Sequence, residues 1–140
     1  MDAFLGTWTG SLESAENIDA FLEKTKIPPQ FINAVKKRQY TTIASKQGDT
    51  YHVINKITSD PQSKEVVYEF QLGKEYEVTD HDGRKTKRVT TWENDKIQEI
   101  RTDDAGHQSF LTIEFLEGGH TATQTMTFDG VSTKLSLRKV

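Results

Sequence analysis

The sequence predicts an all-β fold, in which ten antiparallel strands form an up-and-down β-barrel and two short helices lie over it. Turn-forming pairs such as Asp82-Gly83 and Asp129-Gly130 recur about every 10 to 13 residues. The segments between them alternate apolar and polar residues and are too short to contain the helices that connect parallel strands. Only residues 15–38 have the apolar spacing of helices. Ten twisted strands with one apolar face tend to close rather than leave free edges.

The first helix is expected near the start of the segment Ala15 to Arg38. Either Asn17 or Ser14 can cap it, because both side chains can accept a hydrogen bond from a free backbone N–H. Its apolar residues recur at i, i+3 and i+4 and therefore share one face. They are Ile18, Phe21 and Leu22.

The second helix is expected over Pro29 to Lys37, after a looser link from Lys24 to Ile27. Pro28-Pro29 ends the first helix but suits the first turn of a new one, where a missing N–H is harmless. The second apolar face consists of Phe31, Ile32 and Val35. Neither helix is long enough to be stable alone, so both apolar faces should pack on the strands.

Ten segments have the alternation expected of strands. They are Phe4 to Gly10, Tyr40 to Lys46, Thr50 to Thr58, Val66 to Leu72, Glu75 to Thr79, Lys85 to Trp92, Ile97 to Thr102, Gln108 to Leu116, Thr121 to Phe128 and Val131 to Lys139. In the first segment, Phe4, Gly6 and Trp8 share one face, and Trp8 is expected in the core.

Composition limits the possible functions. With 140 residues, the chain is expected to form one domain, residues 1–140, and to be a monomer. Its net charge of −3 gives no argument for a nucleic-acid partner, and the absence of cysteine excludes disulfides and thiolate chemistry. The start of the sequence has no basic segment followed by an apolar run, so we expect a cytoplasmic, soluble protein without a signal peptide. At 34% hydrophobic residues, the sequence suits a barrel with a cavity better than a dense core.

Several motifs, in their order and spacing along the whole chain, resemble those of the intracellular fatty-acid-binding proteins. They are Asp2 to Trp8, Ala15 to Leu22, Gly48-Asp49, Phe70 to Tyr76 and Asp82 to Lys87. The resemblance implies a ten-stranded barrel of the β-clam type with a helix-turn-helix lid, and a lipid held in a partly hydrated internal cavity.

The same resemblance implies a carboxylate clamp, which this sequence lacks at the usual positions. The family places an Arg and, two residues later, a Tyr on the last strand, and these positions are Leu135 and Leu137 here. The position of a second Arg falls on Ile113 or Phe115. Alternation turns Val131, Thr133, Leu135 and Leu137 inward. A register shifted by one residue would instead turn Lys134 and Ser136 inward.

A charged pair is expected on the inner face of the strand Ile97 to Thr102. Alignment with the family turns Glu99 and Arg101 into the cavity, so we expect Arg101, paired with Glu99, to anchor a ligand head group. In the alternative, Ile100 is buried and the two charges face solvent.

Further residues are expected to line the cavity. The polar ones are Asn55, Asp82, Arg84 and Gln124, although Asp82 and Arg84 could instead shape a turn. The apolar ones are Tyr51, Val53, Ile57, Met126 and Phe128 on the strands, with Ile18, Phe21, Leu22, Phe31 and Val35 beneath the lid. Buried charges are costly unless paired or hydrated, so ordered water is expected beside them.

Catalysis is not expected. The four histidines, His52, His81, His107 and His120, lie on different segments without partners at metal-ligand spacing, and His81 and His107 should be exposed next to turns. No phosphate-binding loop is present, and no metal or cofactor is expected.

The predicted function is intracellular lipid binding and transport, as a non-covalent carrier of a fatty acid or a similar hydrophobic ligand. The alternative is a neutral or ring-shaped ligand such as a retinoid, a sterol or a bile-acid-like molecule, because the clamp positions are apolar. The run Lys36, Lys37 and Arg38 could contact anionic membranes during ligand delivery. Its other interpretation is a solvated helix end with favourable charge.

Overall fold

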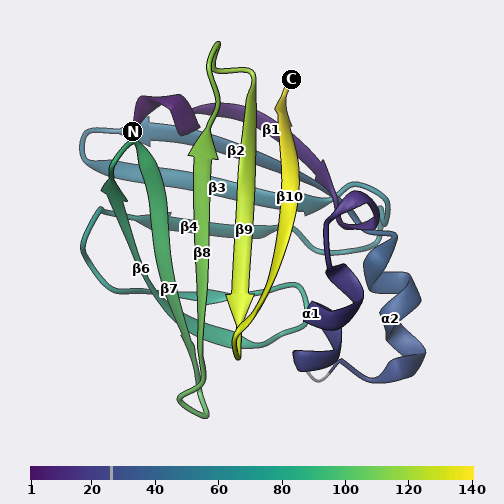
Figure 1. Cartoon of the computed structure of the whole chain (residues 1–140). Helices are drawn as coiled ribbons and strands as arrows, with labels where there is room; N and C mark the ends of the chain where they lie inside the picture. The colour runs from purple at the N-terminus through teal and green to yellow at the C-terminus, as the bar shows by residue number, and fades with distance from the viewer. Residues whose placement is uncertain (26) are drawn as a thin grey trace.

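The computed structural model describes residues 1–25 and 27–140. Ten strands form one antiparallel sheet that curves into a barrel (Figure 1). The strands are β1 (Gly6–Ser11), β2 (Gln39–Gln47), β3 (Thr50–Ile57), β4 (Val66–Phe70), β5 (Tyr76–Thr79), β6 (Lys85–Glu93), β7 (Lys96–Asp103), β8 (Gln108–Phe115), β9 (Thr121–Phe128) and β10 (Val131–Lys139). Each expected segment is confirmed to within one or two residues at its ends.

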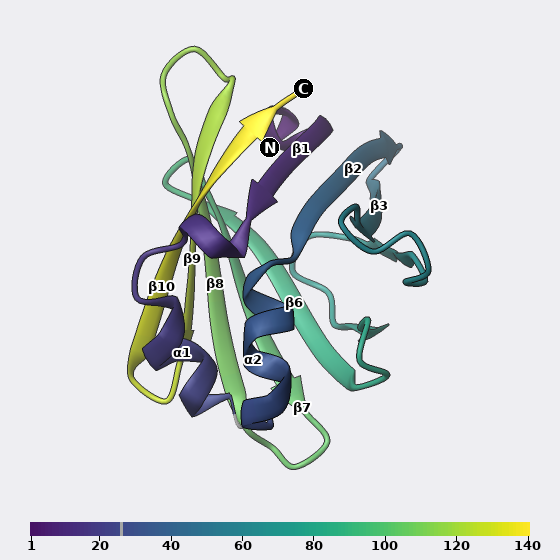
Figure 2. The same cartoon turned by 90° about the vertical axis from the view of Figure 1, so that its right-hand side faces the viewer.

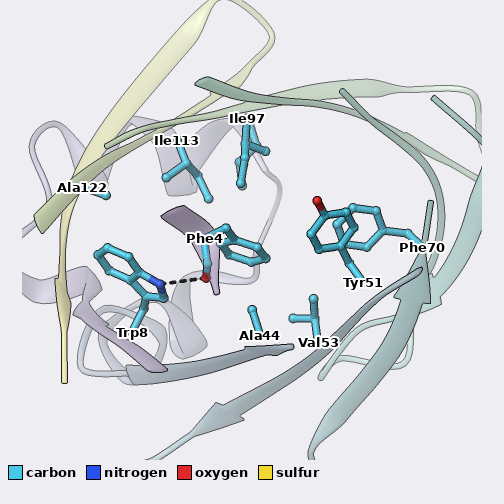
Figure 3. Packing of buried hydrophobic residues seen from close by; sticks show 10 residues of the cluster. Phe4, Trp8, Ala44, Tyr51, Val53, Phe70, Ile97, Ile113 and Ala122 are labelled. Carbon is cyan, nitrogen blue, oxygen red and sulfur yellow. Dashed lines mark hydrogen bonds between the residues drawn. The ribbon is translucent and has the colours of Figure 1, made fainter. Parts of the chain in front are cut away.

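The first strand begins later than expected because Phe4 belongs to a 3₁₀ turn, η1 (Asp2–Phe4). In this turn the N–H groups of Phe4 and Leu5 bond to the carbonyls of Met1 and Asp2. The turn leaves Phe4 buried, and its carbonyl oxygen accepts a 3.0 Å hydrogen bond from Nε1 of Trp8 (Figure 3). The two aromatic residues therefore form one end of the barrel core.

The expected ten-stranded barrel is confirmed, and it is nearly rather than fully closed. The strand order is β4-β3-β2-β1-β10-β9-β8-β7-β6-β5, which places β4 and β5 at the two ends without a ladder between them. Aromatic rings span this gap instead of hydrogen bonds. Tyr76 of β5 stacks on Phe70 and Tyr68 of β4, with ring centroids 5.1 and 5.8 Å apart. Side-chain packing thus holds the two edges together.

Helices α1 (Ile18–Lys24) and α2 (Pro29–Lys36) connect β1 to β2 and lie side by side at one end of the barrel (Figures 1 and 2). Of the expected link from Lys24 to Ile27, Lys26 lies outside the described residues. Neither helix has the length and apolar character needed to cross a membrane, and the described part of the chain contains no other helix that does.

The expected side-chain cap of α1 is wrong. Asn17 occupies the N-cap position, but its backbone is left-handed (φ 60°) and its side chain donates to the carbonyl of Ser132 at 3.0 Å. Ser14 ends a 3₁₀ turn, η2 (Leu12–Ser14), and bonds to the carbonyl of Ser11. Asn17 therefore ties the start of the helix to β10 rather than satisfying the helix itself.

Two apolar clusters fill the molecule. One occupies the barrel end around Trp8, Val53 and Phe70 (Figure 3). The other lies beneath the helices, where Ile18, Phe21, Leu22 and Val35 pack against Leu135 of β10. Phe31 does not join this cluster and is 55% exposed, so its expected place beneath the lid is wrong. Ile32 and Val35 pack against the cluster, whereas Phe31, one turn before Val35 and near the start of α2, stays exposed at the edge of the same face.

Candidate functional site

A cavity of about 370 Å³ lies between the helices and the inner face of the sheet. This volume falls in the range of roughly 300–1,000 Å³ that is typical of small-molecule sites. The helices contribute Phe21, Leu22 and Val35 to its wall. The strands add further apolar side chains, among them Met126 and Leu135. The cavity can therefore shield an apolar chain of ligand size from water.

Most residues predicted to line the cavity do so. They are Phe21, Leu22, Val35, Asn55, Asp82, Arg84, Glu99, Arg101, Ile113, Phe115, Gln124, Met126, Leu135 and Leu137. The exceptions are Ile18, Phe31, Tyr51, Val53, Ile57 and Phe128. Tyr51 and Val53 lie in the cluster around Trp8, and Phe128 packs against the cluster beneath the helices. Ile18 is enclosed in the cluster beneath the helices. Ile57 is buried at the end of β3 opposite Tyr40, and Tyr40 reaches the cavity instead. Contact of any of these residues with a ligand stays a prediction.

The positions of the usual carboxylate clamp are apolar and face inward. Ile113 and Phe115 of β8 and Leu135 and Leu137 of β10 all line the cavity. Leu135 is buried, whereas the neighbouring Lys134 and Ser136 are exposed. The register is therefore the one expected from alternation, and the shifted register is excluded.

Glu99 on β7 is the centre of a buried polar cluster. Its side chain is only 6% exposed, whereas the next residue, Ile100, is 45% exposed, so the alternative with both charges in solvent is wrong. One carboxylate oxygen, Oε2, accepts a hydrogen bond from Nε of Arg101 at 2.5 Å. The other, Oε1, accepts from the hydroxyl of Tyr76 at 2.8 Å and from that of Thr90 at 3.1 Å.

This environment keeps Glu99 ionised. Burial alone would raise the pKa of its carboxyl group. The positive charges of Arg101 and Arg88, with the hydrogen bonds from Arg101 and Tyr76, outweigh burial and hold the pKa of Glu99 below its ordinary value. Burial and the charge of Glu99 raise the pKa of the Tyr76 hydroxyl, which therefore stays protonated. The cluster thus contains a fixed negative charge and neutral phenols.

Arg88 on β6 was not among the predicted site residues, although it is as buried as Glu99, at 5% exposure. It lies opposite Arg101 in the β6–β7 ladder. Its Nε donates to Oγ1 of Thr86 at 3.0 Å, and its guanidinium carbon lies 5.5 Å from the centroid of the Tyr68 ring. Burial and the nearby charge of Arg101 lower the pKa of Arg88 from its ordinary value.

The sequence contained a partial signal for Arg88. Alternation along β6 places Thr86, Arg88 and Thr90 on one face, and Thr90 is a fully buried neighbour. The same strand carries Lys85 and Lys87 on its other face, so positive charge occurs on both sides and does not identify the inner one. The ladder with β7 was needed to place Arg88 beside Glu99 and Arg101.

No protein-family model matches the sequence. Solved structures match along the whole chain. Fatty-acid-binding protein 1 of Echinococcus granulosus superposes with a TM-score of 0.85 at 22% identity, covering 100% of this chain and 99% of the other. The chain has the fatty-acid-binding-protein fold.

Two further structures share this fold. The Schistosoma mansoni fatty acid binding protein in complex with arachidonic acid has a TM-score of 0.83 at 22% identity, covering 100% of this chain and 98% of the other. Secretory abundant heat soluble protein 4 from Ramazzottius varieornatus has a TM-score of 0.83 at 23% identity, covering 100% of this chain and 96% of the other.

In this example of the fatty-acid-binding-protein fold, an ion pair lies at the rim of the cavity. Nη2 of Arg38, two residues beyond α2, lies 3.4 Å from Oδ1 of Asp82 in the β5–β6 turn. The turn itself is stabilised by Asp80, whose Oδ1 accepts from the N–H groups of Asp82 and Arg84. Asp82 therefore links this turn to the segment that follows α2. The turn is shaped by Asp80, and not by the Asp82 side chain as in the alternative from the sequence.

The histidines do not form a site. His81 was expected in solvent but is half-buried, because its ring packs 6.2 Å from Tyr40 and its Nδ1 lies 3.1 Å from the carbonyl of Lys64. His107 is exposed as expected and pairs with Asp103. Among residues 1–25 and 27–140, no three His, Asp or Glu side chains converge as metal ligands would.

Proposed function

We propose that this protein is a non-covalent carrier of a small hydrophobic ligand, a fatty acid or a similar lipid, that it holds within the barrel. The observation that supports this most directly is a cavity of about 370 Å³ whose walls are largely apolar and carry one buried polar cluster. Each methylene group transferred from water into such a cavity contributes about 0.8 kcal/mol. Apolar walls thus supply affinity, and the polar cluster supplies orientation.

The same cavity gives no support for catalysis. Glu99 is held ionised by three hydrogen-bond donors, and the groups around it are arginines, hydroxyls and phenols that carry protons at neutral pH. General acid–base catalysis needs a group whose pKa lies near the working pH. We therefore assign the protein to the carriers rather than the enzymes.

A second candidate is a carrier of a neutral or ring-shaped ligand such as a retinoid, a sterol or a bile-acid-like molecule. It is favoured by the apolar side chains at the four usual clamp positions, Ile113, Phe115, Leu135 and Leu137. We place the carrier in the cytoplasm as a monomer that transports its ligand and contacts anionic membranes through Lys36, Lys37 and Arg38. One protein with the same fold is described as secretory, so the fold alone does not specify the compartment.

Native mass spectrometry of protein purified without delipidation tests this function. We expect a complex with one lipid per chain, and solvent extraction followed by mass analysis then identifies the ligand. A fatty acid supports the first candidate, and a sterol, retinoid or bile-acid-like molecule supports the second. An empty protein that also fails to bind any of these molecules in calorimetry would contradict the carrier function.

A further inference from the structure

The buried cluster carries more positive than negative charge. Arg88 and Arg101 each contribute a guanidinium group, and Glu99 contributes the only carboxylate that pairs with either of them among the described residues. Tyr68 and Tyr76 stay neutral, because burial and the charge of Glu99 raise the pKa of both hydroxyls. One net positive charge is therefore left on the cavity wall.

The two guanidinium groups have unused hydrogen-bond donors. Each makes its side-chain hydrogen bond through Nε, Arg88 to Thr86 and Arg101 to Glu99. A guanidinium has five N–H donors, most of them on its terminal nitrogens. Within the described residues no buried side-chain nitrogen or oxygen lacks a partner, so terminal nitrogens without one must reach open space. Since both arginines line the cavity, that space is the cavity itself.

We propose that Arg88 and Arg101 form a head-group site on β6 and β7 for a single monoanionic carboxylate, with Glu99 as the internal counter-ion that limits the site to one negative charge. This inference rests on the proposed carrier function. It assigns the head group to strands other than β8 and β10, whose cavity-lining side chains are apolar. The acyl chain then lies against those apolar strands and the underside of the helices.

The geometry explains why two arginines serve better than one. They are register partners, so their guanidinium groups come from adjacent strands and can hold the two oxygens of one carboxylate. Glu99 fixes Arg101 in place and cancels one charge. A carboxylate ligand then neutralises the cluster, whereas a neutral head group leaves a buried cation and a dianionic phosphate monoester leaves an excess anion.

Isothermal calorimetry on delipidated protein tests the site with oleate, oleyl alcohol and 1-oleoyl lysophosphatidate. We expect the parent to bind oleate at least about tenfold more tightly than either of the others, since hydrogen bonds to charged groups have this strength. Arg88→Met should lower the affinity for oleate about 10- to 100-fold and change the affinity for oleyl alcohol by less than about twofold. Arg138→Met, which removes an exposed arginine on β10, is the matched control and should change neither.

Thermal unfolding of the delipidated variants separates a binding role from a structural one. Arg88→Met removes an uncompensated buried charge, so its unfolding midpoint should equal or exceed that of the parent. A lower midpoint together with equal losses of affinity for oleate and for oleyl alcohol would overturn the proposal, because Arg88 would then only stabilise the fold.

Glu99→Gln provides a gain of function, because it raises the net charge of the cluster from one to two. It should increase the affinity for lysophosphatidate relative to oleate at least about tenfold. Equal affinity of the parent for oleate and oleyl alcohol would overturn the head-group site but leave the carrier function intact. Failure of the parent to bind any of the three lipids would overturn both.

Discussion

Arg88 and Arg101 lie directly opposite each other on β6 and β7, so that two like charges face one another on the inner side of the barrel. Like charges at opposite positions of an antiparallel pair are destabilising. Among the described residues, Arg101 pairs with one carboxylate, that of Glu99, and Arg88 pairs with none. The arginine pair therefore lowers the folding stability of this chain, and such destabilising arrangements are typical of binding sites.

Glu99→Gln should destabilise the protein in a pH-dependent way. The folded pKa of Glu99 lies below its ordinary value of 4.5, so its ionised form stabilises the fold above that pH. This contribution is lost as the pH falls through the folded pKa, because the parent then also carries a neutral side chain. At pH 7 the variant should lose about 3–5 kcal/mol of unfolding free energy, the usual result of removing one partner of a buried pair.

Urea unfolding of the parent and Glu99→Gln at pH 7 and at acidic pH checks this expectation. The difference in unfolding free energy between the two proteins should shrink as Glu99 of the parent becomes protonated. A difference that stays constant with pH would contradict this prediction. Glu114→Gln is a suitable control, because Glu114 pairs with Lys96 on the surface of β8. Its effect at neutral pH should stay below about 1 kcal/mol.

Tyr76→Phe should destabilise the seam between β4 and β5. The variant keeps the ring that stacks on Phe70 but loses the hydroxyl bonded to Glu99 and Thr90. Leaving those groups short of a partner should lower the unfolding free energy by about 1–3 kcal/mol. Tyr51→Phe is the matched control. The Tyr51 ring also stacks on Phe70, at 5.2 Å, and its hydroxyl makes no hydrogen bond within the described residues.

Chemical denaturation measures both tyrosine variants, and hydrogen exchange locates the effect. Amides of β4 and β5 should exchange faster in Tyr76→Phe than in Tyr51→Phe. Equal stability of the two variants would show that the stacked ring alone holds the seam.

Breaking the ion pair between Arg38 and Asp82 should speed ligand exchange. The pair links the end of α2 to the β5–β6 turn at the cavity rim, so either Arg38→Met or Asp82→Asn frees one side of the opening. A half-exposed ion pair contributes about 0.2–1 kcal/mol, so dissociation of the ligand should accelerate at most about fivefold. The double variant should add nothing further, and salt should accelerate the parent more than the variants.

Stopped-flow release of a fluorescent fatty acid measures these rates. Lys24→Met is the control, because Lys24 joins α1 to Asp129 at 3.8 Å, outside the cavity lining. An unchanged rate in all Arg38 and Asp82 variants would show that ligand exchange does not pass this rim.

Replacing Lys36, Lys37 and Arg38 by Gln should remove any dependence of ligand transfer on anionic lipid. Lys36 pairs with Asp19 at 2.7 Å and Arg38 pairs with Asp82, whereas Lys37 is exposed and has no ion-pair partner among the described residues. Lys37→Gln alone should therefore give most of the effect, about 1 kcal/mol near an anionic surface. The rate of ligand transfer to vesicles of increasing anionic lipid content measures this dependence. If the rate does not change in the variants, the three basic residues only stabilise the end of the helix.

Local patterns determined much of this protein before any long-range contact was known. A period of two placed Leu135 and Leu137 on an inner face, because side chains alternate along a strand. For Glu99 and Arg101 the same period allowed either face, and the resemblance to the family selected the inner face, which is confirmed. Likewise Pro28-Pro29 separated two helices, since proline restricts the backbone locally. The ten strands and the two helices could therefore be predicted.

Only the tertiary structure decided the features that depend on which segments meet. The register of β6 against β7 brought Arg88 opposite Arg101 and next to Glu99, although positive charge on both faces of β6 had concealed it. Tyr76 packs on the aromatic rings of β4 and so joins the two ends of the sheet, and the Asn17 side chain bonds to the carbonyl of Ser132 instead of capping its own helix. A local pattern shows which face a residue occupies, but its partner comes from a distant segment, and that choice is made by packing and charge in the folded chain.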